Sequence, residues 1–393
     1  MERVVIVDST RTGLAKSFRG TFNLTRADDL VAHCIDALLQ RNPNLDPALV
    51  DDVVVGAARQ TGEQSANIAR LATALSALPV SASGMTLSRA CSSGLNAIAV
   101  AAAQIACGQS DVAMAGGVES ITGLERETSS FDENPRLVND LPQFLMPMGE
   151  TAEIVAARYN VSREQQDAYA LQSQQRYAAA QSAGFISEEI SPMTVTWQRK
   201  DRETGEIEAL EGTVDRDECN RANTTLEGLS ELKPVFSETG TVTAGNASQL
   251  SDGASMTLLM SESMAIANGF SPMGYYHGFV VAGCEPDEMG IGPVFAIPQL
   301  MKRHNLTLND IDLVELNEAF ASQCVYCRDA LEIDNDIYNV NGGAIAIGHP
   351  YGMTGSRMTG ALLRELRRRQ KRYGIVSMCV GKGMGAAGLF EAC

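Results

Sequence analysis

The stretch around Cys91 combines a reactive side chain with a change of local pattern, from an extended segment to a run rich in alanine. Apolar residues recur at helical spacing over residues 95–105, and the small residues 92–94 are of the kinds that begin helices. Cys91 is therefore expected at the junction of a strand and a helix. The partial positive charge of a helix N-terminus would lower the pKa of the thiol and favour a nucleophilic thiolate. A buried, unreactive cysteine is the alternative interpretation.

A second candidate, His349, lies in a glycine-rich stretch over residues 342–349 and is followed directly by Pro350. The proline restricts the backbone before it, and the glycines permit close approach of other groups. Of the other histidines, His33 and His304 fall within helical patterns and are interpreted as structural or solvated. An isolated histidine in a loop can be surface decoration, so its position relative to Cys91 decides its interpretation.

Cys379 ends an apolar run over residues 375–380 and enters a glycine-rich turn that contains Gly381. The N–H groups of such a turn are not covered by side chains, which suits an oxyanion hole. Asn317 likewise follows an apolar run directly, over residues 313–316. Chemistry in α/β proteins collects at strand ends, so we expect these side chains to share one site with Cys91 and His349.

Two distant parts of the chain resemble each other, which indicates an internal duplication. The segment NPNLDPALVDDVVV near residue 50 matches HNLTLNDIDLVEL near residue 310, with Asp52 matched to Asp312, 260 residues further on. Cys91 and His349 both precede the third helix of their halves and lie 258 residues apart. Two similar halves packed about a pseudo-twofold axis would bring both helix starts toward one cleft.

The elements that must position these residues alternate between strand and helix before residue 120 and after residue 250, which predicts a layered α/β protein. Strands are expected at residues 4–7, 51–55, 112–115, 254–260, 313–316 and 375–380. Helices are expected at residues 28–40, 67–78, 163–180, 262–268, 296–303 and 356–369, besides the one after Cys91, and residues 342–355 are expected as a turn. Residues 121–249 lack this alternation and are interpreted as an insertion.

The formal net charge of −17 argues against a general nucleic-acid or anionic-membrane partner. No apolar stretch is long enough to span a bilayer, and the first residues do not resemble a secretory signal. Nine irregularly spaced cysteines are therefore expected as reduced thiols in a cytoplasm. A polyanionic ligand would need local cations, and the insertion offers Arg199, Lys200, Arg202, Arg216 and Arg221.

At these residues the chain resembles the thiolase family. The matching blocks, in order, are SRACSSG at Cys91, MGETAE from Met148, TAGNAS from Thr243, NEAFA from Asn317, GGAIAIGHP ending at Pro350, and CVGKGMG from Cys379. The resemblance covers essentially the whole chain. It implies a layered αβαβα fold of two duplicated halves plus an inserted loop domain. The implied division is residues 1–120 with 250–270, residues 121–249 over the active site and coenzyme A, and residues 271–393.

A thiolase makes or breaks the bond between the α and β carbons of a 3-ketoacyl-CoA, so the resemblance implies an acyltransferase of fatty-acid β-oxidation. Cys91 would be the nucleophile that forms the acyl-enzyme. Cys379 would move the proton at the α-carbon of acetyl-CoA. His349 would activate Cys91, and Asn317 would hold a water that completes one oxyanion hole. The N–H groups of Cys91 and Gly381 would form the other.

The resemblance also implies how the substrate is held. Ser248 would contact the pantetheine arm and Arg221 the nucleotide end, and Ala244 and Met148 belong to matched blocks and are expected to contact coenzyme A. Coenzyme A and acyl-CoA would be substrates, with no permanently bound cofactor or metal. The family suggests a homodimer or homotetramer, in some cases with a multifunctional β-oxidation subunit.

Several alternatives stay open on sequence. An acetoacetyl-CoA-specific acetyltransferase is the main one, and a ketoacyl synthase or a non-catalytic acyl-CoA binder are others. Residues 144–146 could line the acyl pocket or only pin the insertion to the core. The pair Cys324 and Cys327 is expected in a helix rather than in a redox or metal site, and the basic run 364–372 as a solvated helix end. Three further cysteines are interpreted as core: Cys34, Cys107 and Cys284.

Overall fold

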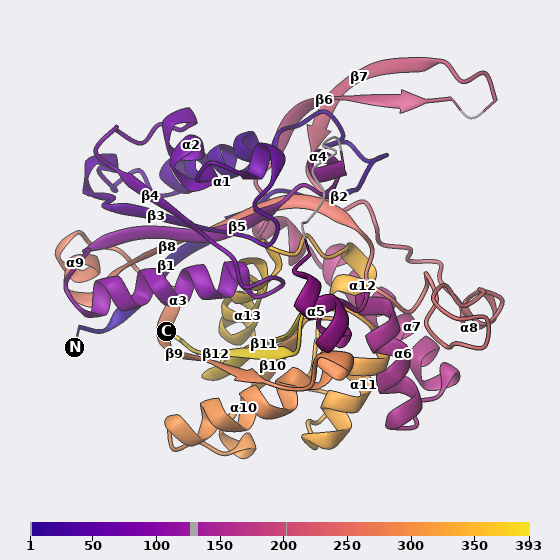
Figure 1. The fold of residues 1–393 in the computed structure, drawn as a ribbon. Coiled ribbons are helices and arrows are strands. Elements are labelled where there is room, and N and C mark those ends of the chain that lie inside the picture. The colour runs from indigo at the N-terminus through magenta and orange to yellow at the C-terminus, as the bar shows by residue number, and fades with distance from the viewer. Residues whose placement is uncertain (1, 126–132, 202) are drawn as a thin grey trace.

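The centre of the protein is one mixed 10-stranded sheet, seen in a computed structural model that describes residues 2–125, 133–201 and 203–393 (Figure 1). The strand order is β10-β11-β12-β9-β1-β8-β5-β3-β4, with β2 beside β8. The strands are β1 (Val4–Arg11), β2 (Ala15–Lys16), β3 (Asp52–Ala57), β4 (Ser83–Leu87), β5 (Val112–Glu119), β8 (Ser251–Ser261), β9 (Gly274–Gly283), β10 (Leu313–Leu316), β11 (Tyr373–Val380) and β12 (Met384–Ala392).

The sheet has the same order on both sides of its middle pair, β1 and β9. Outward from β1, antiparallel β8 and β5 are followed by β3, parallel to β5; outward from β9, antiparallel β12 and β11 are followed by β10, parallel to β11. The counterpart of β4 beyond β10 is reduced to one parallel bridge, Val314 to Tyr338. The middle pair itself is joined over only three residue pairs, Val4 to Ile6. This repeated topology confirms the predicted duplication.

The repeat offset is 261 residues, which corrects the matching made from sequence. Equivalent elements begin at residues 52 and 313, 93 and 354, and 112 and 373, for β3 and β10, α3 (Ser93–Ala106) and α13 (Thr354–Arg369), and β5 and β11. Asp51, not Asp52, is therefore the counterpart of Asp312. The Asp51 carboxylate accepts hydrogen bonds from the N–H groups of Asp111 and Val112, and the Asp312 carboxylate accepts from those of Arg372 and Tyr373.

Alternating strand residues build the layers. In β3, Val53 packs with the apolar residues of α1 (Ala27–Arg41) and α2 (Ile68–Leu75), whereas Val54 faces a separate core with α3 and α13. In β11, Val376 joins the α3 and α13 core, whereas Ile375 packs with α10 (Gly292–Arg303) and α11 (Ala321–Ala330). Helices α3 and α13 thus pack between the inner faces of the two halves of the sheet, and α1, α2, α10 and α11 cover the outer faces. This gives the αβαβα arrangement visible in Figure 1.

The inner helices approach each other at two equivalent glycines. A methyl group added to Gly94 in α3 would lie 2.6 Å from the Gly352 carbonyl oxygen, and one added to Gly355 in α13 would lie 2.6 Å from the Leu95 backbone nitrogen. Gly94 and Gly355 are counterparts under the same offset. Only glycine permits this separation, so the sequence brings the two helix starts into direct contact.

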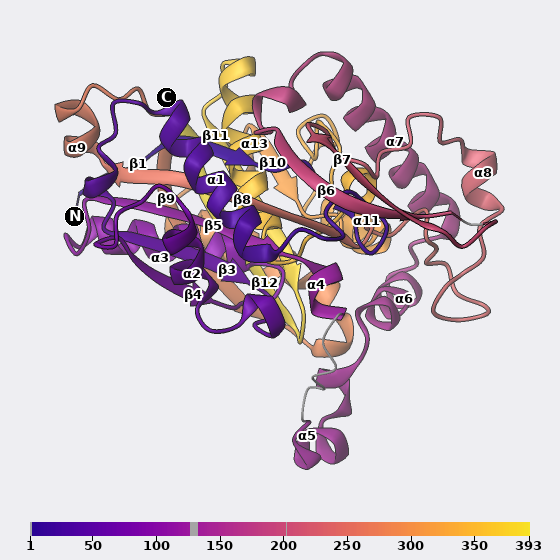
Figure 2. The same ribbon diagram turned by 90° about the horizontal axis from the view of Figure 1, so that it is seen from above.

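Residues between β5 and β8 form the insertion, which covers one end of the sheet (Figure 2). It contains α4 (Ile121–Glu125), α5 (Pro135–Asp140), α6 (Met148–Arg158), α7 (Arg163–Ser182), α8 (Leu226–Ser230) and the hairpin of β6 (Met193–Lys200) with β7 (Ile207–Val214). Helix α7 begins with a reciprocal capping box between Ser162 and Gln165. The hairpin projects from the body of the molecule in Figure 1.

Most expected elements are present, with extensions and some omissions. Strands β9 and β12 and the hairpin strands were not predicted, and the expected turn over residues 342–355 contains a short helix, α12 (Ala344–Ile347). The helix expected to reach residue 78 ends at Leu75, whereas α9 (Glu262–Ala267) agrees within one residue. Within the described ranges, no helix has the length and apolar character needed to cross a membrane.

Candidate active site

Cys91 lies in the tight turn between β4 and α3, as the sequence predicts. Ala90 has a φ of 44°, a left-handed conformation that is uncommon for a residue with a Cβ. The Ser93 hydroxyl stabilises this turn, because it donates to the Ala90 carbonyl oxygen (2.6 Å) and accepts from the Arg89 N–H (2.9 Å). Cys91 itself is half-buried at the start of the inner helix.

The electrostatic surroundings of Cys91 differ from the sequence-based expectation. Burial raises the pKa of its thiol to about 11, the N–H of Gly381 opposes the rise by hydrogen bonding, and the Glu119 carboxylate adds to it. The prediction that the helix start lowers this pKa is therefore wrong, since desolvation of the thiolate outweighs the helix dipole. A thiol with this pKa is protonated near neutral pH, so a nucleophilic Cys91 requires a base.

His349 supplies a neutral imidazole. Its Nδ1 lies 2.7 Å from the Thr354 hydroxyl oxygen, and that hydroxyl is placed to donate its only hydrogen to the Pro350 carbonyl oxygen (2.9 Å). We therefore assign the ring hydrogen to Nδ1 and a lone pair to Nε2. Burial and, secondarily, the Arg357 charge lower the pKa of His349 to about 3, so it is uncharged at neutral pH.

Asn317 directly follows β10 and contacts this imidazole. Its backbone N–H donates to the Ser377 carbonyl oxygen, and its side-chain Nδ2 lies 3.2 Å from His349 Nε2. In the part of the chain that the structure describes, the buried Asn317 Oδ1 has no hydrogen-bond partner. A buried acceptor without a partner is a place where water or a ligand donor would be bound.

Cys379 and Gly381 complete the cluster at the end of β11. The Cys379 sulfur is buried and lies 3.6 Å from Gln323 Oε1. Its pKa is raised well above the ordinary value, first by burial and next by the charge of Cys91. The N–H of Gly381 is placed to donate to the Cys91 sulfur. The two thiols and this N–H therefore meet at one place, although residues 91 and 379 are far apart in the chain.

The expected coenzyme A residues lie in two places. Arg221 and Ala244 line a groove of about 270 Å³, together with Gln174, Cys219, Asn223, Thr224, Thr225, Gly228, Leu229, Leu232, Gly245 and Gln249. Ser248 is next to that wall and donates its N–H to the Ala319 carbonyl oxygen. Met148 instead packs with Ala319 and Cys379 at the thiol cluster. Gln249 links the two places, since its carbonyl oxygen accepts the His349 N–H at 2.9 Å.

The other cations of the insertion do not line this groove. Arg199 and Lys200 line a separate hollow of about 1190 Å³ beside the β6–β7 hairpin, and Arg216 is exposed elsewhere. Arg202 lies outside the described residues. Of the four described cations among those expected to meet phosphates, Arg221 is the one that lines the groove.

Sequence reasoning did not identify Thr354, Gln249 or Gln323, each of which contacts a candidate catalytic residue. Thr354 could have been found, because it is the first residue of the helix that follows His349. Gln249 and Gln323 carry no signal in the sequence, since their contacts join elements that are distant along the chain. Glu119 was also missed; its buried carboxylate accepts from the N–H groups of Ala58 and Gly352.

The remaining cysteines lie outside this cluster, although Cys327 and Cys284 add to the raised pKa of Cys379. Cys324 and Cys327 are buried in α11, and their thiols donate to the carbonyl oxygens of Asn317 and Gly290. All nine cysteines are free, and among the described residues no group of three or more His, Cys, Asp or Glu side chains could hold a metal ion. Cys107 is exposed, so its assignment to the core is wrong, and Cys284 is only half-buried.

The basic run 364–372 contains the end of α13 at Arg369, as expected, but only 10% of the Arg364 side chain is exposed, so it is not solvated throughout. Arg368 and Arg369 pair with Glu365, and Arg364 with Asp8. These cations bind acidic side chains of the same protein, which is consistent with a structural role.

A layered αβαβα protein with a cysteine, a histidine and a second cysteine at the ends of its inner helices and adjoining strand fits one family model in two parts. The thiolase N-terminal domain matches residues 4–263, and the thiolase C-terminal domain matches residues 270–392. The chain therefore belongs to the thiolase family.

Individual relatives match along the full length. "3-ketoacyl-CoA thiolase 1, peroxisomal" of Arabidopsis thaliana is 46% identical over 391 residues, covering 99% of this chain and 87% of that protein. "3-ketoacyl-CoA thiolase" of Bacillus subtilis is 44% identical and is covered completely, as is this chain. The crystal structure of the dimeric peroxisomal thiolase of Saccharomyces cerevisiae superposes with a TM-score of 0.90 at 38% identity, over 100% of this chain and 98% of that one.

Proposed function

We propose that this protein is a 3-ketoacyl-CoA thiolase, an acetyl-CoA C-acyltransferase that uses coenzyme A to cleave 3-ketoacyl-CoA into acetyl-CoA and a shortened acyl-CoA in β-oxidation. The names of the full-length relatives support this activity. The observation that carries it here is the meeting of Cys91, Cys379 and the Gly381 N–H, together with a neutral His349 that contacts Asn317 at the end of the adjoining strand. Carbon–carbon cleavage needs a nucleophile for the β-carbon and a separate acid for the α-carbon, and two thiols supply them.

In the first half-reaction, His349 Nε2 takes the proton of the Cys91 thiol, and the sulfur attacks the 3-keto carbon. The new sulfur–carbon bond forms a tetrahedral oxyanion, and its collapse breaks the bond between the α and β carbons. The acyl group stays on Cys91, and the departing acetyl-CoA enolate takes the proton of Cys379. A high pKa of the Cys379 thiol suits this step, because the group must arrive protonated.

In the second half-reaction, the Cys379 thiolate takes the proton of the coenzyme A thiol, whose sulfur then attacks the acyl carbon on Cys91. Collapse of the second tetrahedral oxyanion releases acyl-CoA, and His349 returns its proton to the Cys91 sulfur. Each group ends in its starting protonation state. The N–H groups of Cys91 and Gly381 stabilise one oxyanion, and a water held by the unpartnered Oδ1 of Asn317 completes the other site.

The groove beside the thiol cluster is proposed to hold coenzyme A. Arg221 would bind its phosphates, Ser248 and Ala244 its pantetheine arm, and Met148 would contact the acyl thioester end. The net charge of −17 leaves the protein repelling a polyanion over most of its surface, so one correctly placed arginine has a large share in binding. Under this proposal residues 121–249 are the domain that covers the site, between halves formed by residues 1–120 with 250–270 and residues 271–393.

A homodimer is proposed as the basic assembly, with a tetramer and a multifunctional β-oxidation subunit as further partners. Strand β4 lies at the end of the sheet and pairs only with β3 among the described strands. Large apolar side chains are exposed around it: Leu71, Leu75, Val80 and Met85. An exposed edge strand with an apolar border is suited to pairing with a second copy. Nine free thiols fit a reducing compartment, for which we propose the cytoplasm.

Thiolysis measured over a series of 3-ketoacyl-CoA chain lengths tests the proposal. We expect acetyl-CoA release with substrates longer than acetoacetyl-CoA. Turnover restricted to acetoacetyl-CoA would assign the protein to the acetoacetyl-CoA-specific acetyltransferases instead. Absence of thiolysis with every chain length would contradict both activities.

A further inference from the structure

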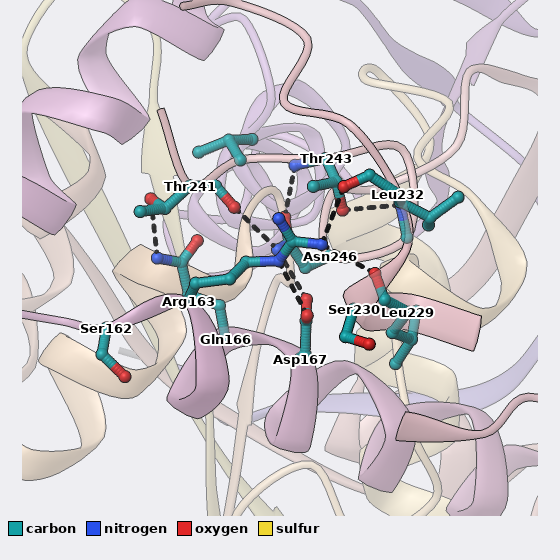
Figure 3. A network of polar contacts seen from close by, with 12 residues as sticks. Ser162, Arg163, Gln166, Asp167, Leu229, Ser230, Leu232, Thr241, Thr243 and Asn246 are labelled. Carbon is teal, nitrogen blue, oxygen red and sulfur yellow. Dashed lines mark hydrogen bonds and ion pairs between the residues drawn. The ribbon is translucent and has the colours of Figure 1, made fainter. Parts of the chain in front are cut away.

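Arg163, Asp167 and Asn246 form a polar network in the insertion that connects the two walls of the coenzyme A groove (Figure 3), and none of the three is among the residues that line the groove. One wall is formed by α8 and the residues after it, including Leu229 and Leu232. The other is the loop that contains Ala244 and Gly245. Both walls are bonded to the first turns of α7, where Arg163 and Asp167 are one helical turn apart.

Arg163 binds the first wall. Its guanidinium donates to the carbonyl oxygens of Leu229 (2.7 Å) and Leu232 (3.0 Å), at the C-terminal end of α8. The Leu229 carbonyl oxygen also accepts the Leu232 N–H (3.1 Å), but a helix of five residues is not stable alone. The position of this wall therefore depends on the contact with Arg163.

Asp167 binds both Arg163 and the second wall. One carboxylate oxygen accepts from Arg163 Nε at 2.7 Å, and the other accepts from Asn246 Nδ2 at 2.9 Å. Asn246 is completely buried and holds its own loop, since its Oδ1 accepts the Thr243 N–H and its Nδ2 also donates to the Thr241 carbonyl oxygen. Its backbone oxygen accepts the Ala321 N–H, which ties the loop to the segment that begins at Asn317.

We infer that Arg163 and Asp167 are positioning residues for the coenzyme A arm, because they fix the separation of the groove walls relative to the reacting thiols. This inference rests on the proposed function of the groove. Asp167 is the junction: it is 4% exposed, and replacing one of its oxygens by an amide nitrogen would set a donor against either the guanidinium or the Asn246 amide. A change of wall separation weakens ground-state and transition-state binding alike, so it raises KM and leaves kcat.

The test compares Asp167→Asn and Arg163→Met with wild type, using coenzyme A and N-acetylcysteamine as acyl acceptors. N-Acetylcysteamine has the thiol but lacks the pantoic acid and nucleotide parts that occupy the groove. We expect KM for coenzyme A to rise about tenfold with kcat within about twofold, and kcat/KM with N-acetylcysteamine to change less than about twofold. Arg158→Met is the matched control, since Arg158 pairs with Asp287 and Glu288 at the end of α6 and has no bond to either wall.

Equal losses with both acceptors would overturn the inference, because they would indicate general damage to the fold, and so would an unchanged KM for coenzyme A in both variants. If Asp167→Asn does not fold, Arg163→Met decides, since that side chain is partly exposed. Calorimetric titration with coenzyme A provides a readout that does not need turnover: the dissociation constant should rise about tenfold in both variants. If the wild type binds coenzyme A but performs no thiolysis, the proposed function is contradicted. The change in dissociation constant measured by titration then decides this inference.

Discussion

The starts of α3 and α13 are equivalent positions in the repeat. Their packing contacts are alike, but the residues in the turns that precede them differ. Gly94 and Gly355 make the same close contact in both directions, and Asp51 and Asp312 bind the starts of the neighbouring strands β5 and β11 in the same way. The turns before the helices differ. The counterpart of Cys91 is Gly352, and the counterpart of His349 is Ser88.

This difference separates two kinds of constraint. Positions that determine how the halves pack are repeated, because the same packing must be satisfied twice. Positions that carry chemistry are not repeated, because one reaction centre needs one nucleophile and one base. Substitutions at positions where the two halves carry different residues should therefore reduce turnover and leave stability nearly unchanged. Substitutions at positions where both halves carry the same residue should reduce stability and leave turnover nearly unchanged.

The largest effect is expected for Cys91→Ser, at a position whose counterpart in the second half is Gly352. A hydroxyl is a far weaker nucleophile than a thiol with the same base, so thiolysis should fall by at least about 10³-fold. The midpoint of thermal unfolding should change by less than that of an ordinary core variant. Cys107→Ser, at the exposed far end of the same helix, is the control and should keep full activity. Normal turnover by Cys91→Ser would contradict its assignment as nucleophile.

Cys379→Ala is expected to divide the reaction into its halves. With acetyl-CoA as donor, Cys91 should still become acetylated, because coenzyme A can leave as its thiolate and, without Cys379, take from His349 the proton that Cys91 lost. Condensation of the acetyl group with a second acetyl-CoA should be lost, since no base remains at the α-carbon. Mass spectrometry of the intact protein measures the adduct. Cys327→Ala removes another buried thiol and should retain both steps. Absence of acetylation in Cys379→Ala would show that the two cysteines do not divide the work in this way.

The pH dependence of Cys91 alkylation tests whether burial in the turn before α3 raises the pKa of this thiol. Because burial raises the pKa of the free enzyme's thiol to about 11, the thiolate fraction at neutral pH is small and increases with pH. Alkylation by iodoacetamide should therefore accelerate about tenfold for each pH unit between 7 and 10. Peptide mass mapping follows Cys91 separately from the other thiols. A rate that levels off below pH 8 would indicate a thiol already ionised by the helix start.

Gly94→Ala and Gly355→Ala should each destabilise the protein by roughly 1–3 kcal/mol, through the same contact approached from opposite sides. Helix propensity alone would favour alanine by up to about 1 kcal/mol, so the expected sign is set by packing. Gly228→Ala in α8 is the control for the substitution, since its added methyl would have its nearest neighbour 3.5 Å away. Urea unfolding measures the free energies. Clearly different losses of unfolding free energy at the two glycines would contradict the equivalence of the two inner helices.

The smallest effects are expected for Asp51→Asn and Asp312→Asn, each about 1 kcal/mol, because each carboxylate accepts two backbone N–H groups at the surface. Hydrogen bonds from the Arg372 and Tyr373 backbone lower the pKa of Asp312 despite its partial burial. Its contribution is therefore complete above its ordinary pKa and is lost as pH falls through the lowered value. Urea unfolding at pH 7 and at pH 3 should show that Asp312→Asn costs less at the lower pH.

Much of the scaffold could be predicted from local pattern. The alanine-rich helix, the strand that contains Cys379 and the duplication all follow from periodicity and repeated motifs, and β10 agrees residue for residue. Strands β9 and β12 were missed because glycines interrupt them and because neither strand alternates between buried and exposed residues. The repeat offset was wrong by one at Asp52, because two consecutive aspartates match Asp312 equally well without the hydrogen bonds.

The chemical cluster could be predicted only as a set of residues. Motif and strand-end position were enough to select Cys91, His349, Asn317 and Cys379. Their protonation was not predictable, because the pKa of Cys91 depends on desolvation by segments from both halves. The partners Gln249 and Gln323 likewise depend on contacts across the fold. Local sequence therefore indicates which atoms take part, whereas their acidity belongs to the assembled structure.

The contact between Gly94 and Gly355 has a consequence for how substrate is exchanged. The starts of the two helices pack with no space for a methyl group between them, and the thiol cluster lies at these helix starts. Opening the halves like a hinge would separate the reacting groups from each other. Under the proposed function, an acyl thioester would therefore enter and leave along the groove rather than through an opening between the halves.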